Sequence, residues 1–230
     1  MPRPAVLGHR GASAYAYQNS LAAFRRAREM GADGIELDIH ATTDGVLVVH
    51  HDPVLDGVGV IAAHRFADVQ RAVLPDGAPV PTLADALTAA QEMAVWIEVK
   101  TLPAEYDGRL LAAIAGGPHP ERYGIHGFDH RIIARLGARA PGLRRGVLSA
   151  SRPIDPVAPV LAAGAEVLWQ ESSLTDQDLV AALHAGGKQV IAWTPNDPDE
   201  LARLVAIGVD GLCSNYPDRA RVAAGLPARP

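Results

Sequence analysis

Short apolar, β-branched segments alternate with amphipathic segments along nearly the whole chain. The amphipathic segments repeat their apolar positions at helical spacing, and several begin at Asn, Thr or Asp and end at Gly, as helix caps do. Because parallel neighbouring strands need a helical connection, strict alternation of strand and helix predicts a parallel sheet. The apolar segments predict eight strands, at residues 6–11, 34–40, 96–100, 123–128, 144–149, 166–170, 189–194 and 210–215.

The number of strand–helix units favours one kind of parallel sheet. Eight units in 230 residues suit a closed (β/α)8 barrel, an α/β fold also called a TIM barrel. The alternative is an open doubly wound sheet, which normally has a Gly-x-Gly-x-x-Gly turn after its first strand, and residues 9–13 (HRGAS) lack that turn. Residues 41–81 interrupt the alternation with a short apolar run and a loop-rich segment. We therefore expect a single domain over residues 1–230, with a small insertion after the second strand at roughly 52–81.

Composition excludes some partners. The 21 basic and 26 acidic residues are scattered, and the net charge is −5, so the chain lacks the clustered Lys and Arg that nucleic acid would attract. No apolar run approaches the ~18 residues of a membrane span, and the first predicted strand begins too early for a signal peptide. We expect a cytoplasmic protein without stable membrane insertion. The single cysteine, Cys213, lies in an apolar run and is expected to be a buried, inert thiol.

The predicted second strand has an unusual face. Residues 34–40 read GIELDIH, with three apolar residues on one parity and Glu36, Asp38 and His40 on the other. Successive side chains of a strand point to opposite faces. One face of this strand therefore carries two carboxylates and an imidazole.

Other polar residues fall at corresponding positions of other strands. The active site of a (β/α)8 barrel lies at the C-terminal ends of its strands. The chemistry-bearing residues at those ends are His9, Arg10, Glu36, Asp38, His50, His51, Asp52, Glu98, Lys100 and Trp193. We expect them to share one rim.

The carboxylates of Glu36, Asp38 and Glu98 suggest a metal site. Crowded carboxylates repel one another and gain proton affinity unless a cation compensates them. Oxygen-only ligands favour one hard divalent cation, Mg²⁺ or Ca²⁺. The alternative is an internal salt-bridge network in which Arg10 and Lys100 neutralise the acids. Both interpretations fit the spacing.

His9 and His51 suggest acid–base chemistry beside the acidic cluster. An imidazole changes charge near neutral pH, so two of them suit a general acid and a general base. A divalent cation, Arg10 and Lys100 would supply positive charge for an anionic substrate, and phosphate is the natural candidate. The pattern therefore predicts metal-assisted chemistry on a phosphate ester or phosphodiester.

In chain order, the segments HRGAS, NSLAAF, GADGIELDIHATTDGVLVVHHDP, WIEVK, IAWTPN and GVDGLCSNYPD resemble the glycerophosphodiester phosphodiesterase family. The resemblance runs from His9 to Asp218, and its most specific parts are HRG, E-x-D followed by T-x-D-G-x-x-V-x-x-H-D, and E-x-K. It implies a (β/α)8 barrel with a small insertion after the second strand. It also implies hydrolysis of glycerophosphodiesters to an alcohol and glycerol 3-phosphate, with Mg²⁺ or Ca²⁺.

The resemblance also implies a role for each matching residue. The metal ligands would be Glu36, Asp38 and Glu98, the acid–base pair His9 and His51, the phosphate-binding cations Arg10 and Lys100, and an aromatic wall of the substrate pocket Trp193. In related barrel phosphodiesterases a substrate hydroxyl attacks the phosphate first. By analogy the glycerol 2-hydroxyl would attack here and form a cyclic phosphate.

Three short stretches depart from the family pattern. Where the family usually has P-E-N-T, this chain has Tyr17 and Gln18 in place of Pro and Glu. Thr43 stands where the family usually has Lys, and Ser214–Asn215 replaces Thr-Asp at the end of the last strand. These changes remove charge of both signs near the rim, which bears on the head group that the site accepts.

Several residues near the predicted site are expected to lie outside it. We expect His40 to support the site indirectly or to be exposed, and His50 to pack against a helix. Although His126 ends the fourth strand, we expect it to lie outside the site. Trp96 and Trp169 are expected in the core.

Two other functions fit the same residues. One is a lipid phosphodiesterase of the lysophospholipase D or phospholipase C type, which usually needs an apolar or basic docking rim. Residues 54–61 (VLDGVGVI) form only a short apolar patch, which favours a water-soluble substrate. The other is a ligand-binding barrel without activity. The presence of both histidines and all three carboxylates favours an enzyme.

Overall fold

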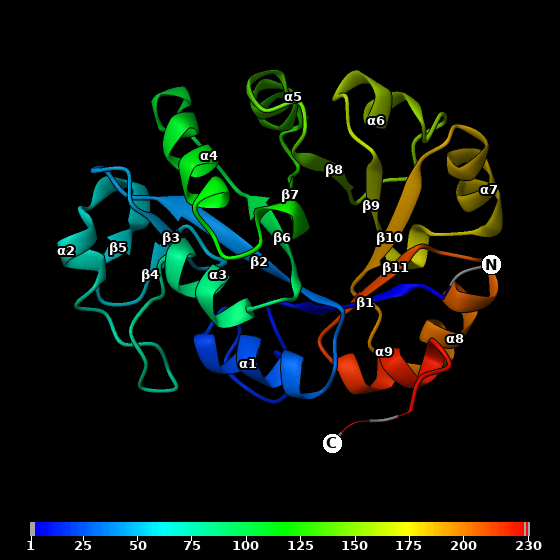
Figure 1. The fold of residues 1–230 in the computed structure, drawn as a ribbon, viewed down its shortest axis with the longest axis horizontal. Helices are drawn as coiled ribbons and strands as arrows, with labels where there is room; N and C mark the ends of the chain where they lie inside the picture. The colour runs from blue at the N-terminus through cyan, green and yellow to red at the C-terminus, as the bar shows by residue number, and fades with distance from the viewer. Residues whose placement is uncertain (1–2, 228, 230) are drawn as a thin grey trace.

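The protein folds as a barrel of eight parallel strands surrounded by helices, as predicted (Figure 1). The structure is a computed structural model that describes residues 3–227 and 229. The barrel strands are β1 (Ala5–His9), β2 (Gly34–Ala41), β6 (Ala94–Val99), β7 (Tyr123–His126), β8 (Arg144–Ser149), β9 (Val167–Glu171), β10 (Gln189–Trp193) and β11 (Gly211–Ser214). The sheet closes because β1 pairs in parallel with both β11 and β2.

The first barrel strand is shorter than the sequence pattern predicts. β1 ends at His9, and the chain then turns sharply because Arg10 and Gly11 have φ angles of 56° and 81°. This turn places the His9 side chain at the end of its strand.

Helices cover the outside of the barrel. They are α1 (Leu21–Glu29), α3 (Leu83–Ala90), α4 (Asp107–Ala115), α5 (His130–Arg139), α6 (Ala158–Ala162), α7 (Gln177–Ala185), α8 (Pro198–Ala206) and α9 (Pro217–Ala223). Single 3₁₀ turns lie at Ile61–Ala63 (η1), Ala104–Tyr106 (η2), Pro120–Arg122 (η3) and Ser172–Leu174 (η4). The side chains of Ser20, Thr82, Asp129, Asp176 and Asp197 cap helices by accepting a backbone N–H. The polar residues that mark helix starts in the sequence therefore form the expected hydrogen bonds.

The insertion after the second strand begins with a short strand, β3 (Leu47–Val49), that pairs antiparallel with β2. Beyond it lie a small two-stranded sheet, β4 (Val54–Leu55) with β5 (Gly59–Val60), and the short helix α2 (Phe66–Val69), as Figure 1 shows beside the barrel. These elements enclose a small apolar cluster of their own: Val48, Leu55, Ile61, Val69, Leu74 and Val80.

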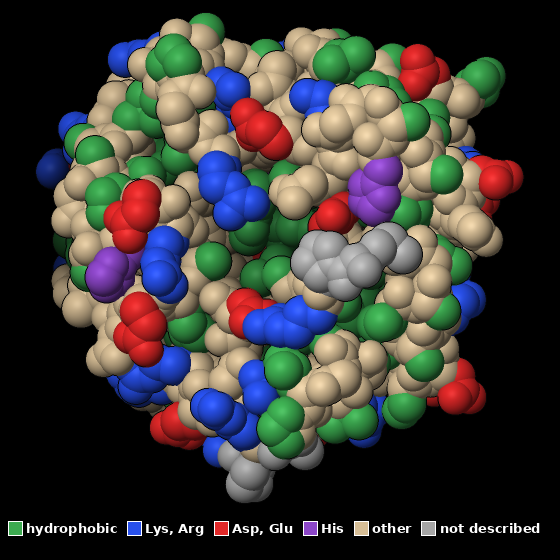
Figure 2. All heavy atoms as spheres, turned by 45° about the vertical axis from the view of Figure 1, so that its right-hand side comes forward, with side chains coloured by type: hydrophobic (Ala, Val, Ile, Leu, Met, Phe, Trp, Pro, Cys, Tyr) green, Lys and Arg blue, Asp and Glu red, His purple; other side chains and the backbone are tan. Residues whose placement is uncertain are grey.

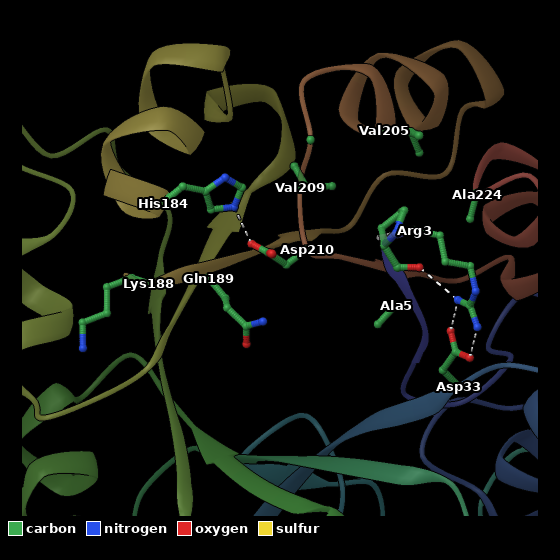
Figure 3. Close-up of a pocket in the computed structure, with 12 residues that line it drawn as sticks. Arg3, Ala5, Asp33, His184, Lys188, Gln189, Val205, Val209, Asp210 and Ala224 are labelled. Carbon is green, nitrogen blue, oxygen red and sulfur yellow. Dashed lines mark hydrogen bonds and ion pairs between the residues drawn. The ribbon is translucent and has the colours of Figure 1, made fainter. Parts of the chain in front are cut away.

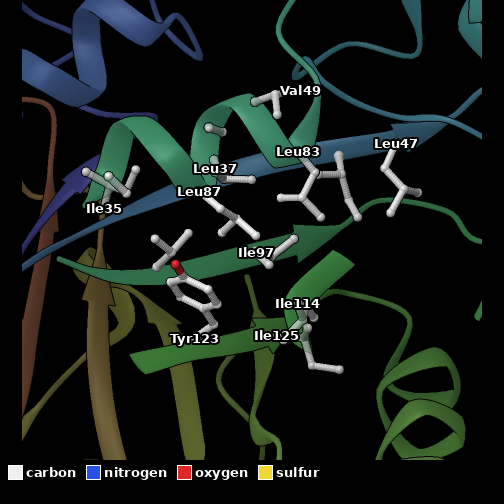
Figure 4. Close-up of a cluster of buried hydrophobic side chains, with 14 of the residues drawn as sticks. Ile35, Leu37, Leu47, Val49, Leu83, Leu87, Ile97, Ile114, Tyr123 and Ile125 are labelled. Carbon is white, nitrogen blue, oxygen red and sulfur yellow. The ribbon is translucent and has the colours of Figure 1, made fainter. Parts of the chain in front are cut away.

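The main apolar core lies between the barrel and its helices. Ile35 and Leu37 on β2 pack with Leu83 and Leu87 of α3 in the same cluster as Ile97 on β6 (Figure 4). The apolar parity of the second strand therefore faces the helices, as predicted, and the acidic parity faces the barrel interior.

Large side chains fill the part of the barrel interior that lies away from the C-terminal ends of the strands. Glycines that face the interior leave room for them. Trp96 and Trp169 are buried with ring centroids 5.3 Å apart, so their expected core position is confirmed. A Cβ atom on Gly146 would lie only 2.6 Å from Trp169 Cδ1, and one on Gly124 only 2.8 Å from the Trp96 ring. The two glycines therefore leave the space that the indole rings occupy.

We expect Gly146→Ala to lower the free energy of unfolding by about 1–3 kcal/mol, because the added methyl group overpacks the barrel interior. Gly142→Ala is the matched control, since a Cβ there meets nothing within 4 Å and neither glycine has a positive φ. Denaturant unfolding of both variants measures the difference. Equal stabilities would contradict the packing role of Gly146.

Candidate active site

Three carboxylates meet inside the barrel near the C-terminal ends of the strands. Glu36 and Asp38 come from β2 and Glu98 from β6, where Asp38 and Glu98 are paired neighbours in the sheet. One oxygen from each residue lies within 4.8 Å of the others, and the residues are only 2%, 0% and 7% exposed. This acidic triad could hold one metal ion, and its all-oxygen donor set suits a hard divalent cation.

Two basic side chains contact the acidic triad. Lys100 Nζ lies 2.9 Å from Asp38 Oδ1 and 2.7 Å from Glu98 Oε1. Arg10 Nε lies 3.2 Å from Asp38 Oδ2, and the Arg10 backbone N–H donates to Glu36 Oε2 over 3.1 Å. The predicted salt-bridge network is therefore present, but both basic side chains converge on Asp38.

The pKa values show that these ion pairs leave the triad incompletely neutralised. Burial, reinforced by the charge of Asp38, raises the pKa of Glu36 to about 7 and that of Glu98 to about 8. Burial alone would raise the pKa of Asp38 as well, but Lys100 and Arg10 lower it below its usual value. Two of the three acids therefore retain protons near neutral pH, where a divalent cation would compete for the same oxygens. The triad fits a metal ion as well as a salt-bridge network.

The two predicted acid–base histidines line the same small cavity, of about 70 Å³, as Glu36 and Glu98. His9 ends β1, and its Nδ1 donates to Asn215 Oδ1 over 2.7 Å. Burial lowers the pKa of His9. His51 follows β3, and its Nδ1 lies 2.7 Å from Asp52 Oδ1. The two rings thus have different partners, an amide and a carboxylate.

The insertion is held against the barrel close to these groups. The His50 backbone N–H donates to the Asp38 carbonyl over 3.1 Å, and His40 Nε2 lies 3.0 Å from the His51 carbonyl. His40 is therefore buried and supports the segment that carries His51. His50, which we expect to pack against a helix, is half-buried, and its Nδ1 lies 2.9 Å from the Asp52 carbonyl.

The structure brings together every residue predicted for the site. The cavity is lined by His9, Arg10, Glu36, His51, Glu98, Lys100 and Trp193, and Asp38 lies against Lys100 and Arg10. Trp193 is partly buried, and its Nε1 donates to the Trp169 carbonyl over 3.1 Å. Trp193 therefore forms part of the cavity wall.

Five cavity residues were not assigned to the site by the sequence analysis: His126, Phe128, Leu148, Trp169 and Cys213. Trp169 was expected in the core, and it both packs there and lines the cavity. His126, expected outside the site, is buried and lines the cavity, with its ring centroid 4.1 Å from that of Trp169. Burial lowers its pKa to about 3. Phe128 is half-exposed at the mouth and meets Trp193 edge-to-face at 5.7 Å. The signal for His126 was its pairing with Glu98, which gives both side chains the same inward direction.

A larger cavity, of about 800 Å³, lies at the opposite end of the barrel, where β1 and β10 begin (Figure 3). Four of its charged or titratable side chains form two pairs, Arg3 with Asp33 at 2.7 Å and His184 with Asp210 at 2.9 Å, and Lys188 Nζ donates to the Ala165 carbonyl. Active sites of (β/α)8 barrels lie at the other end, where the acidic triad is. The small cavity is therefore the candidate active site despite its size.

The molecular surface agrees with the scattered charge of the sequence. On the face shown in Figure 2, basic and acidic side chains are interspersed rather than gathered into a patch of one sign. Among the helices that the structure describes, none combines the length and apolar character needed to cross a membrane.

The chain and its fold are similar to those of known proteins. The model of the glycerophosphoryl diester phosphodiesterase family matches residues 9–219. A glycerophosphodiester phosphodiesterase of Caldanaerobacter subterraneus subsp. tengcongensis is 31% identical, covering 93% of this chain and 94% of the relative. A solved glycerophosphodiester phosphodiesterase of Parabacteroides distasonis superposes with a TM-score of 0.88 at 22% identity, covering 97% of this chain and 98% of the other. A phosphodiesterase of Oleispira antarctica, solved with the product sn-glycerol-3-phosphate, has a TM-score of 0.88 at 23% identity, covering 97% of each chain.

The fold and the site therefore define a barrel hydrolase of phosphodiesters. The chain belongs to the glycerophosphodiester phosphodiesterase family.

The raised pKa values of Glu36 and Glu98 predict how metal affects stability. In metal-free protein, these groups favour folding fully below their ordinary pKa of 4.5, and that contribution is lost as pH rises through about 7 to 8. A divalent cation binds the deprotonated carboxylates, so its stabilising effect should grow over the same range. Thermal unfolding at pH 6 and pH 9, with Mg²⁺ or Ca²⁺ and with chelator, measures this difference.

Glu98→Gln is the control for the same experiment, since it keeps the side-chain shape and removes one charge. We expect the variant to fold and to lose most of the metal-induced rise in Tm. A rise that is the same at both pH values, or that survives Glu98→Gln, would show that the cation binds elsewhere.

Proposed function

We propose that the protein hydrolyses glycerophosphodiesters to an alcohol and glycerol 3-phosphate, with one Mg²⁺ or Ca²⁺ held by Glu36, Asp38 and Glu98. The observation that carries the proposal is the convergence of His9, His51 and the acidic triad on one cavity. When bound, the cation would supply positive charge to the phosphate oxygens. Arg10 and Lys100 line the same cavity and would bind the phosphate directly.

The hydrogen bonds of the two histidines support a division of roles. Because His9 donates its Nδ1–H to Asn215, the neutral ring presents an unprotonated Nε2 and is suited to accept a proton. His51 Nδ1 lies 2.7 Å from the Asp52 carboxylate, which orients the ring, and in this proposal His51 donates a proton to the leaving alcohol. We assign His9 as the base and His51 as the acid of the first step.

The nucleophile in this proposal is the 2-hydroxyl of the glycerol moiety. His9 takes its proton while the oxygen attacks phosphorus, and the bond to the leaving alcohol breaks as His51 protonates that alcohol. Water then opens the cyclic phosphate, with the two histidines in reversed roles. Trp193 and Phe128 flank the mouth of the cavity and would limit the entry of bulk water.

A lipid phosphodiesterase is the second candidate, because three apolar side chains of the insertion face solvent. Val54 and Val60 are paired across the small sheet and are 50% and 48% exposed, and Val73 is 67% exposed. Turnover of lysophosphatidylcholine at a higher kcat/KM than that of water-soluble glycerophosphodiesters would favour this function.

We expect His9→Ala and His51→Ala each to lower kcat for glycerol 3-phosphate release by about 10²–10⁴-fold, because each removes a proton-transfer group. The metal-induced rise in Tm should remain in both variants, since neither ring belongs to the triad. His184→Ala is the control, because this exposed histidine lies at the opposite end of the barrel. Wild-type turnover that survives complete removal of divalent cations would contradict the metal role.

The proposed nucleophile predicts a substrate requirement. A glycerophosphodiester analogue that lacks the 2-hydroxyl should bind but release alcohol at least about 10²-fold more slowly, since direct attack by water would replace the positioned hydroxyl. Quenched single-turnover reactions on the natural substrate should contain a cyclic glycerol phosphate. Full activity on the 2-deoxy analogue would contradict attack by the substrate hydroxyl.

A further inference from the structure

A second depression adjoins the candidate active site. It has a volume of about 320 Å³ and is lined by His9, Arg10, Ser13, Tyr17, Gln18 and Asn215. His9 and Arg10 also line the cavity that contains the acidic triad. A phosphate bound at these two residues would therefore have the triad on one side and this depression on the other.

The carbonyl oxygens of the two amides in this depression are already used. Gln18 Oε1 accepts a hydrogen bond from Arg10 Nη1 over 2.6 Å. Asn215 Oδ1 accepts one from His9 Nδ1 over 2.7 Å and another from Ser13 Oγ over 3.0 Å. The amide oxygens, which are the strongest acceptors of these side chains, thus already accept hydrogen bonds from the protein.

The nitrogens of the same two amides are available for hydrogen bonds to a ligand. Over residues 3–227 and 229, neither Gln18 Nε2 nor Asn215 Nδ2 donates to a protein acceptor. Each NH₂ group carries two donors. The depression therefore presents mainly donors to a ligand, and the guanidinium of Arg10 adds to them.

The permanent charge among the side chains that line the depression is positive. Among its six lining residues, Arg10 is the permanently charged one, and none is Asp or Glu. Tyr17 is the single aromatic residue, and part of its ring packs against the apolar cluster of the insertion. A cationic ligand in the depression would meet Arg10 and no lining carboxylate or aromatic cage, since the ion-pair partner of Arg10, Asp38, is not among the lining residues.

We propose that this depression, which we call the amide subsite (Ser13, Tyr17, Gln18 and Asn215), binds the leaving alcohol and selects an uncharged polyhydroxy alcohol. This inference rests on the proposed function. Hydroxyl oxygens accept hydrogen bonds from both amide NH₂ groups, whereas ammonium groups accept none. Both amide oxygens already accept hydrogen bonds from the protein, so a primary ammonium group would depend mainly on the Ser13 and Tyr17 hydroxyls. The substrates favoured are therefore diesters of glycerol phosphate with glycerol or inositol, rather than with choline or ethanolamine.

The first test compares kcat/KM of the wild-type protein for four substrates: glycerophosphoglycerol, glycerophosphoinositol, glycerophosphocholine and glycerophosphoethanolamine. We expect both polyol substrates to exceed both cationic substrates by about tenfold or more, the effect of one or two hydrogen bonds. Equal or higher kcat/KM for the cationic substrates would overturn the inference and leave the proposed function intact. Release of glycerol 3-phosphate from none of the four would overturn both.

The second test adds a carboxylate to the subsite without changing its size. In Gln18→Glu and Asn215→Asp, the ratio of kcat/KM for polyol to cationic substrates should fall at least about fivefold, because a carboxylate attracts the ammonium group. The ratio is the readout because any effect on Arg10 or His9 acts on all four substrates alike. Gln189→Glu is the matched control, since it adds the same charge at the opposite end of the barrel. An unchanged ratio in both subsite variants would overturn the inference.

Discussion

The structure is organised by the need to accommodate three carboxylates inside a closed barrel. Asp38 is fully buried, and Glu36 and Glu98 are nearly so, over a floor formed by Trp96 and Trp169. These indole rings exclude water, so the free-energy cost of a negative charge on each carboxylate is higher than in solvent. Lys100 and Arg10 relieve that cost for Asp38, while Glu36 and Glu98 are left with a high affinity for protons. The same unneutralised negative charge would suit the triad to a divalent cation.

The burial of the three carboxylates is accompanied by tight packing of the barrel interior beneath them. The indoles fill the barrel beneath the acids because Gly124 and Gly146 lack side chains that would occupy the same space. His126 lies between the two layers, with its ring against Trp169 and its Nε2 3.7 Å from Glu36 Oε1. The side chains inside the barrel thus change from apolar to ionic within a few residues' distance along its axis. The acidic triad and the histidines of the cavity lie at that boundary.

The sequence predicted the barrel and the convergence of the carboxylates, histidines and basic side chains on one cavity. The alternation of residues 34–40 gave the direction of each side chain on β2, because strand faces alternate strictly and the apolar set had to face the helices. Residue spacing could not place His126, since the inward direction of that short strand depends on its register with β6. It also could not show that Asn215 contacts His9, because these residues are 206 positions apart and meet only when the barrel closes. The amide subsite follows from that same closure.

The second histidine of the proposed acid–base pair is not carried by a barrel strand. His51 follows β3 on the insertion, which is attached to β2 by the β2–β3 pairing, by the His50 backbone N–H and by the His40 side chain. Local opening of that segment would separate His51 from His9 while leaving the eight-stranded barrel folded. Catalytic competence and global unfolding are therefore governed by different equilibria, and hydrogen exchange at the amides of residues 47–50 would report on the first independently of the second.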